Sequence, residues 1–152
     1  MTIDEHLQKW RRFDAARAGL DADRDFELGF WAMLSAGTTI INAALHAAGV
    51  TRENDLFATQ IPDVYAVHDG GKAWHHELGS LCDLIHVGLP ELDCELPPEI
   101  ARAFAAMHVI ERYRDPCIRS GAPATADVKA ACSAAYADLL AAIQPILQGA
   151  AQ

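Results

Sequence analysis

The sequence lacks the cysteine spacings that hold metals or carry out redox chemistry. Its four cysteines are Cys82, Cys94, Cys117 and Cys132, and no two of them form a C-x-x-C pair. A zinc knuckle or a thioredoxin-like motif is therefore not indicated. The opening residues, MTIDEHLQKWRRFD, are charged and lack the apolar core of a signal peptide. We therefore expect a cytoplasmic protein with reduced thiols.

Sequence motifs of several enzyme classes are also missing. There is no G-x-S-x-G nucleophile turn and no glycine-rich loop that would cradle a phosphate. Basic residues are few, with 12 Lys and Arg against 21 Asp and Glu, and the net charge is −9. A chain of this charge is repelled by nucleic acids and anionic membranes, so general binding to either is not expected. The absence of these motifs favours a non-catalytic function over an enzymatic one.

Strand-forming residues are scarce, while alanine is abundant. Valine and isoleucine are sparse, and alanine favours helices because it loses no side-chain entropy there. No segment shows sustained alternation of apolar and polar residues. The length of 152 residues is typical of one domain that folds without disulfide or metal support. We therefore expect one all-α domain over residues 1–152.

A long uncharged stretch, residues 28–51, requires a test for a membrane span. It is about long enough to cross a bilayer. However, it contains glycines, threonines, a serine, an asparagine and a histidine, which make a poor membrane helix. A central helix that neighbours bury on most sides explains the same pattern. We expect that central helix and no membrane insertion.

Capping residues and glycines mark two N-terminal helices. Thr2 and Glu5 have the spacing of a capping box, and Gly19 is placed to end the first helix. The second helix starts near Asp21 or Asp23 and is closed by Gly49. At roughly 25 residues it would be about 37 Å long and form the axis of a bundle.

Three long helices and one short helix are predicted after residue 51. Residues 53–58 could add a short helix, and a longer one runs from about residue 72 to 86. The next helix starts at Pro98 and ends before Pro116. Thr125 caps the last helix, which Pro145 bends or ends. The predicted fold is an up-and-down bundle of four to five helices around a long central helix.

The stretch WHHELGSLCDLIH, residues 74–86, is the first candidate site. On a helix, His75, Cys82 and His86 would share one face, and His76 and Asp83 an adjacent face. Imidazole, thiolate and carboxylate groups suit zinc or another first-row metal. Neither set of residues supplies a complete metal site by itself.

Any metal site would therefore recruit ligands from other helices, and His46 and His108 are the candidates. The ion would be zinc, nickel or manganese, held in a bundle core as in DinB-like proteins. The alternative is that these histidines are exposed or cap helix ends, as His86 would. No cofactor is established by the sequence.

The second candidate site is the arginine cluster in ERYRDPCIRSG, residues 111–121. Arg112, Arg114 and Arg119 could grip a small anionic ligand, because guanidinium groups recognise phosphate and carboxylate in two-point contacts. The structural alternative is that Glu111 and Asp115 pair with these arginines within the chain.

The long stretch FELGFWAMLSAGTTIINAALHAAGV, followed by an irregular segment and a helix ending in ERYRDP, resembles the HEPN superfamily. The resemblance covers approximately residues 23–121. It implies a small all-α bundle, often dimeric, from a group that includes ribonucleases and nucleotide-binding proteins. The ribonuclease members carry an Arg-x4-6-His motif, whereas no histidine follows His108 here.

The resemblance therefore implies a binding or interaction module that lacks this nuclease activity, since imidazole makes acid–base chemistry workable near neutral pH. We expect a homodimer. Ser35, Ala36 and Gly37 would permit close helix approach, although packing within one chain uses the same residues. The alternatives are the metal-binding bundle and the binder of a small anionic ligand.

Overall fold

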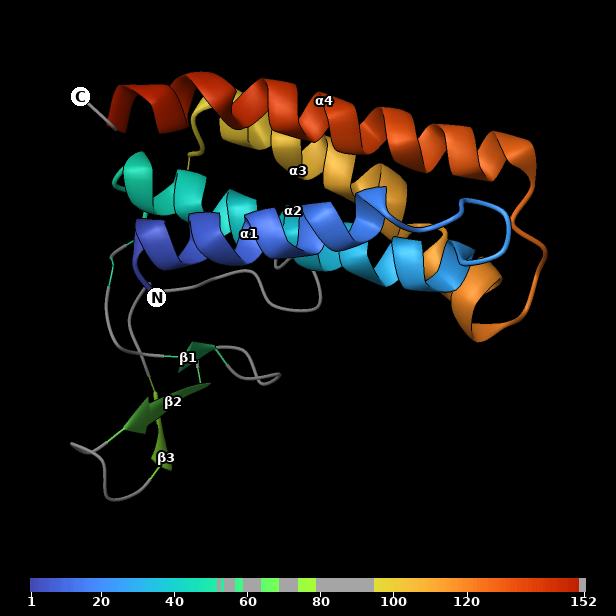
Figure 1. Cartoon of the computed structure of the whole chain (residues 1–152). Helices are drawn as coiled ribbons and strands as arrows, with labels where there is room; N and C mark the ends of the chain where they lie inside the picture. The colour runs from blue at the N-terminus through green and yellow to red at the C-terminus, as the bar shows by residue number, and fades with distance from the viewer. Residues whose placement is uncertain (52, 54–56, 59–63, 69–73, 79–94, 151–152) are drawn as a thin grey trace.

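Four α-helices form an antiparallel bundle in the computed structural model, which describes residues 1–51, 53, 57–58, 64–68, 74–78 and 95–150. They are α1 (Ile3–Ala18), α2 (Phe26–Ala47), α3 (Pro98–Glu111) and α4 (Ala126–Ala150). Consecutive helices run in opposite directions, and the two chain ends lie at the same end of the bundle (Figure 1). The predicted up-and-down helical bundle is confirmed.

The helix ends follow the local signals in the sequence. Thr2 and Glu5 form the complete capping box, with the Glu5 amide donating to the Thr2 hydroxyl at 3.2 Å. Gly19 ends α1, and Gly49 follows α2 with a φ of +71°, a left-handed conformation that suits glycine. Pro98 occupies the first turn of α3, and the Thr125 hydroxyl accepts from the Val128 amide at 3.3 Å.

Two predicted helix boundaries differ from the structure. α2 has 22 residues and begins at Phe26, after the predicted Asp21 or Asp23. Asp21 instead accepts the amides of the next loop residues and holds a turn ahead of the helix. α4 continues through Pro145 to Ala150, so Pro145 does not end it. A π-helix, η1 (Arg114–Arg119), follows α3.

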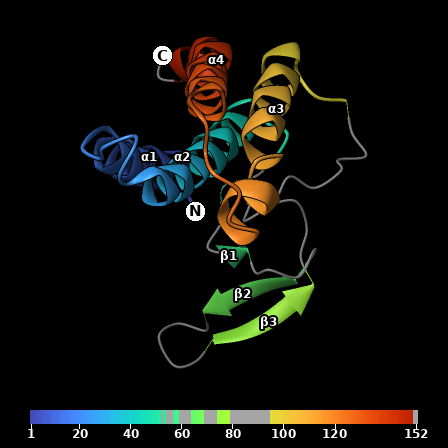
Figure 2. The same cartoon turned by 90° about the vertical axis from the view of Figure 1, so that its right-hand side faces the viewer.

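α2 is the central element, because it packs against all three other helices. Viewed along the bundle, α2 lies between α1 and α3, and α4 covers one side (Figure 2). Its side chains Phe30, Ile40, Ile41 and Leu45 are each at most 1% exposed. They share one core with Ile100, Met107 and Ile110 of α3 and with Leu139 and Ile143 of α4.

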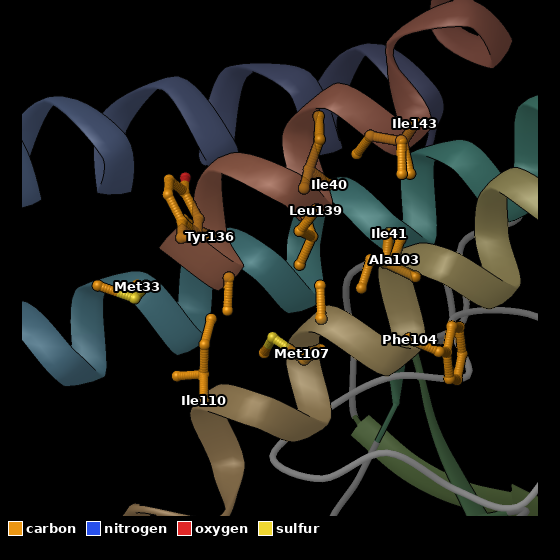
Figure 3. Packing of buried hydrophobic residues seen from close by; sticks show 14 of the residues in the cluster. Met33, Ile40, Ile41, Ala103, Phe104, Met107, Ile110, Tyr136, Leu139 and Ile143 are labelled. Atoms are coloured by element: carbon orange, nitrogen blue, oxygen red, sulfur yellow. The ribbon is translucent and has the colours of Figure 1, made fainter. Parts of the chain in front are cut away.

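Gly37 is the point of closest helix approach. A methyl group at this position would lie 2.7 Å from the Met107 sulfur and 3.4 Å from a Leu139 methyl. Met107 and Leu139 point into the space between α2, α3 and α4 (Figure 3). Because Ala36 and Gly37 are buried in the monomer, they serve packing within the chain. They therefore give no support to the expected dimer.

The segment between α2 and α3 contains a small antiparallel sheet, which the sequence reading missed. Its strands are β1 (Phe57–Ala58), β2 (Val64–His68) and β3 (Trp74–Leu78), in the order β1-β2-β3. In both views the sheet lies beside the bundle (Figures 1 and 2). The predicted helices over 53–58 and 72–86 are therefore wrong at residues 57–58 and 74–78.

Pairing between distant segments explains this error. β2 contains Val64, Tyr65 and Val67, residue types that favour strands. It pairs with β3 in a register that sets Ala66 opposite His76 and Val67 opposite His75. Backbone hydrogen bonds to a partner strand override the weak helical preference of WHHEL.

Among the described residues, two helical stretches, 26–47 and Ala126–Gly149, are long and apolar enough to cross a bilayer by length and composition. In α2, 67% of the tested stretch is buried, so its position in the core explains its apolar character. In α4 only 33% is buried. The exposed residues of α4 are alanines mixed with polar residues such as Asp138 and Gln144, so burial accounts for less of its apolar character than in α2.

The close packing at Gly37 predicts unequal effects of two glycine-to-alanine changes in α2. Gly29→Ala should raise the free energy of unfolding by about 0.5–1 kcal/mol, because alanine favours the helix and its methyl meets only Leu20 at 4.0 Å. Gly37→Ala brings the same helical gain but crowds Met107, which costs about 1–3 kcal/mol. Urea unfolding should therefore rank Gly37→Ala below Gly29→Ala. Equal stabilisation by both changes would contradict the packing.

Candidate functional site

A pocket opens where α1 joins α2, on the side that faces the start of α4. Its volume is about 200 Å³. Apolar side chains make up its floor, and charged side chains surround its mouth. The lining residues are Arg17, Ala18, Leu20, Asp21, Ala22, Asp25, Phe26, Gly29, Phe30, Met33, Lys129, Cys132 and Ser133.

The α1–α2 loop fixes one side of the pocket mouth. The Asp21 carboxylate accepts the amides of Asp23 at 3.0 Å and Arg24 at 2.8 Å. The Asp25 carboxylate accepts the Asp21 amide at 3.2 Å and the Arg24 guanidinium at 2.8 Å. These two bonds, with the guanidinium the larger contributor, lower the pKa of Asp25. Both carboxylates are therefore occupied by the loop itself.

Lys129 supplies the cation at the opposite side of the mouth. Its ammonium donates to the Asp23 carboxylate at 2.5 Å, and this hydrogen bond is the main cause of the lowered pKa of Asp23. The Lys129 side chain is 22% exposed, whereas that of Asp23 is 91% exposed. Ion pairs with a fully solvated partner contribute little to stability. A ligand carboxylate could therefore replace Asp23 at low cost.

A hydrogen-bonded group beside the pocket joins α1 to α4. The Tyr136 hydroxyl accepts from the Trp10 indole at 3.1 Å and donates to the Asp14 carboxylate at 3.0 Å. Arg17 donates to the same Asp14 oxygen at 2.9 Å and lies 4.6 Å from the centre of the Tyr136 ring. Tyr136 points from α4 toward α1 (Figure 3). This group holds Arg17 at the pocket wall.

Two pocket-side groups are kept neutral by burial. Desolvation raises the pKa of the Cys132 thiol to about 11 and that of Tyr136, with a further contribution from Asp14, to about 12. Cys132 is 1% exposed, so it lies in the floor as a small apolar residue. A thiol of this kind is not a reactive nucleophile, and the pocket suits binding better than covalent chemistry.

The arginine cluster forms ion pairs within the chain. Arg114 contacts Glu111 at 3.2 Å, and Arg119 contacts Asp115 at 3.1 Å. Arg112 donates to the Tyr113 hydroxyl at 2.8 Å. The structural alternative thus has direct support, while binding of an anionic ligand by these arginines stays a prediction.

The predicted metal ligands do not come together as one group in the described part of the chain. His75 and His76 lie on strand β3, so their helical spacing does not apply, and Cys82, Asp83 and His86 lie outside the described residues. His108 is exposed on α3, whereas His46 is buried near the end of α2. Within the described ranges, no three His, Cys, Asp or Glu side chains form a metal-binding group.

The sequence reading did not single out His6 or the pocket. His6 is 2% exposed and its ring lies 5.3 Å from that of His46, measured between centroids. A signal was present, because His6 falls at helical spacing with Ile3, Trp10 and Phe13 on the apolar face of the first helix. The pocket had no such signal, since its walls come from three helices and a loop.

Comparisons with protein-family models, curated proteins and solved structures found no match to this chain. The resemblance to the HEPN superfamily therefore stays a prediction. The function has to be inferred from the geometry of the chain itself.

The buried Tyr136 and Cys132 predict a loss of stability in alkali. Each group has a higher pKa in the folded protein than in the unfolded chain, so stability is constant below about pH 9 and falls as the pH rises toward 11–12. Each contributes at most about 3 kcal/mol to this loss.

Urea unfolding between pH 8 and 11.5 measures the effect. Tyr136→Phe should lower stability at pH 8 by about 1 kcal/mol, because Asp14 and Trp10 each lose a partner. It should also flatten the decline above pH 10. Tyr113→Phe is the matched control, since Tyr113 is outside this group. An unchanged slope in Tyr136→Phe would refute the assignment.

Proposed function

We propose that this protein is a non-catalytic binding module of the cytoplasm that takes up a small amphipathic ligand with one anionic group. The observation that supports this proposal best is the pocket between α1, α2 and α4, where an apolar floor lies under a lysine with a solvated partner. Ligand sites in proteins commonly combine apolar walls with a few placed polar groups.

The distribution of charge favours an anionic ligand over a cationic one. The carboxylates of Asp21 and Asp25 already accept hydrogen bonds from the loop, and Asp14 holds Arg17. Lys129 has three N–H donors, of which Asp23 accepts one. A ligand anion at Lys129 would therefore replace a weak surface contact instead of competing with buried ones.

The floor of the pocket determines the chemical character of the uncharged part of the ligand. Phe26, Phe30 and Met33 line it from α2, and Cys132 lines it from α4. These side chains favour an alkyl or aryl group, which would lose its contact with water on binding. A short-chain carboxylate such as octanoate has this combination and is a suitable probe.

The pocket has two side chains that could most readily act in catalysis, and the state of both is consistent with the expected lack of catalysis. Cys132 is kept as a neutral thiol, and Lys129 is paired with Asp23. The predicted HEPN resemblance also favours a binding role, because the Arg-x4-6-His motif is missing from the sequence.

Octanoate should bind in the pocket and depend on Lys129. Isothermal titration is expected to show one site per chain, with at least a tenfold loss of affinity in Lys129→Ala. Lys129→Arg, which keeps the charge, should retain most of the affinity. Neutral octanol should bind equally to the parent protein and to Lys129→Ala, because only the floor recognises it.

A second variant tests whether octanoate binds in this pocket. Gly29 lines the pocket, and a methyl group there would meet only Leu20, at 4.0 Å, so Gly29→Leu should fill the cavity without destabilising α2. It is expected to abolish octanoate binding while keeping or raising the melting temperature. If no carboxylate binds the parent protein, or if Gly29→Leu binds octanoate as well as the parent does, the proposal fails.

We further propose that two copies associate through the groove between α3 and α4. Alanines and Val109 line this groove, and the exposed Arg102 and Asp138 add opposite charges from the two helices. In a two-fold symmetric dimer, Arg102 of each copy can meet Asp138 of the other. The tested stretch of α4 is only 33% buried, and its exposed alanines, such as Ala130 and Ala134, support an interface there.

A charge exchange tests this dimer. Sedimentation of the parent protein should give twice the 16.4 kDa mass of one chain. Arg102→Asp and Asp138→Arg should each produce monomers, because like charges then face each other. The double variant should restore the dimer. A parent protein that sediments as a monomer at high concentration would rule out the interface.

A further inference from the structure

Arg17 is a second cationic side chain on the wall of the ligand pocket. It lines the cavity together with Lys129, and its side chain is 29% exposed. Since a guanidinium stays charged at any physiological pH, the pocket offers a ligand one cation from α1 and one from α4. The contacts of Arg17 therefore bear on which ligand the pocket selects.

Asp14 and Tyr136 fix the orientation of the Arg17 guanidinium. Nε and Nη2 of Arg17 donate to one Asp14 oxygen at 3.1 and 2.9 Å, and its Cζ atom lies 4.6 Å from the centre of the Tyr136 ring. The ring is held in turn by its hydroxyl, which donates to Asp14 at 3.0 Å, and it points from α4 toward α1 (Figure 3). A guanidinium held on two sides loses little further freedom when a ligand binds.

Only part of the Arg17 guanidinium is occupied by these contacts. The group has five N–H donors, and Asp14 accepts from two of them. The other three, two on Nη1 and one on Nη2, donate to no group in the part of the chain that the structure describes. A ligand oxygen in the pocket can therefore accept from Arg17 without displacing Asp14.

The two cations of the pocket are separated along one face of α4. Tyr136, over which Arg17 lies, follows Lys129 by seven residues, which is two helical turns or roughly 10 Å. Cys132 lines the pocket between them. This separation is comparable to the length of an extended eight-carbon chain, so one ligand can reach both cations while its chain lies on the apolar floor.

The charges around Arg17 favour a neutral oxygen over a second carboxylate. Asp14 already offsets the charge of Arg17 at 2.9 Å, and a ligand carboxylate on the same guanidinium would be repelled by the Asp14 carboxylate. A hydroxyl or carbonyl oxygen accepts a hydrogen bond without that repulsion. Lys129 differs, because its partner Asp23 is 91% exposed and can be replaced by a ligand carboxylate.

On the basis of the proposed function, we propose that Arg17 selects ligands with a hydroxyl or carbonyl oxygen at the end of the chain away from the carboxylate. The ligand class is then an ω-hydroxy or ω-oxo carboxylic acid. Lys129 holds the carboxylate, the apolar floor covers the alkyl chain, and Arg17 donates to the distal oxygen.

Isothermal titration of the parent protein with four related ligands tests this selection. 8-Hydroxyoctanoate should bind about tenfold more tightly than octanoate, because hydrogen bonds to charged donors are strong. Octanedioate should gain no affinity over octanoate, since its second carboxylate meets Asp14. 4-Hydroxyoctanoate should bind at least tenfold more weakly than octanoate, because its hydroxyl would lie unpaired on the apolar floor.

A substitution at Arg17 assigns the preference to this residue. Arg17→Met removes the donors but keeps an unbranched side chain, so it should bind octanoate as the parent does and lose the preference for 8-hydroxyoctanoate. Arg12→Met is the matched control, because Arg12 is exposed on the same helix and does not line the pocket. It should keep the tenfold preference.

The outcomes separate this selection from the proposed function. If octanoate does not bind the parent protein, both fail. If octanoate binds and 8-hydroxyoctanoate binds no more tightly, only the role of Arg17 is refuted. That role is also refuted if octanedioate binds more tightly than 8-hydroxyoctanoate, or if the preference for the hydroxyl persists in Arg17→Met.

Discussion

The close contact of α2 with α3 and α4 at Gly37 is the constraint on which the rest of the structure depends. A side chain at this position would collide with the Met107 sulfur, 2.7 Å away, so glycine sets how near the three helices lie. That spacing lets Ile40 and Ile41 fill the layer on one side of Gly37 and Phe30 the layer on the other. Because α2 is enclosed in this way, its two ends are the places where the core can admit polar groups.

Those two ends carry different chemistry. At the start of α2, the loop carboxylates are satisfied by backbone amides and Arg24, and the adjoining cavity has an apolar floor. At the other end, Asn42 and His46 are buried polar residues within the last two turns. The middle of the helix separates them with a continuous apolar core. The two ends of α2 therefore differ in the polar groups that they bring to the core.

The helical bundle could be predicted because its signals are local. Thr2, Gly19, Gly49 and Pro98 mark helix ends through bonds to near neighbours. The strand Trp74–Leu78 could not be predicted in this way, because its pairing partner is a separate segment, Val64–His68. The helical face assigned to His75 and His76 assumed a helix and had no independent support. His46 was recognised as a candidate, but its neighbour His6 depends on how α1 packs against α2, which spacing within one helix does not reveal.

The composition of α4 explains how the chain can expose an apolar helix. The apolar side chains on its outer face are mainly alanines, such as Ala130, Ala134 and Ala141, which are exposed among polar residues such as Asp138 and Gln144. Each alanine presents little apolar area, so hydrophobic attraction across this face is weak compared with a face of leucines. Association there requires close, flat packing and a second source of specificity. In the proposed dimer, Arg102 and Asp138 would provide it, because their opposite charges favour one symmetric arrangement and disfavour contact of this groove with other acidic surfaces.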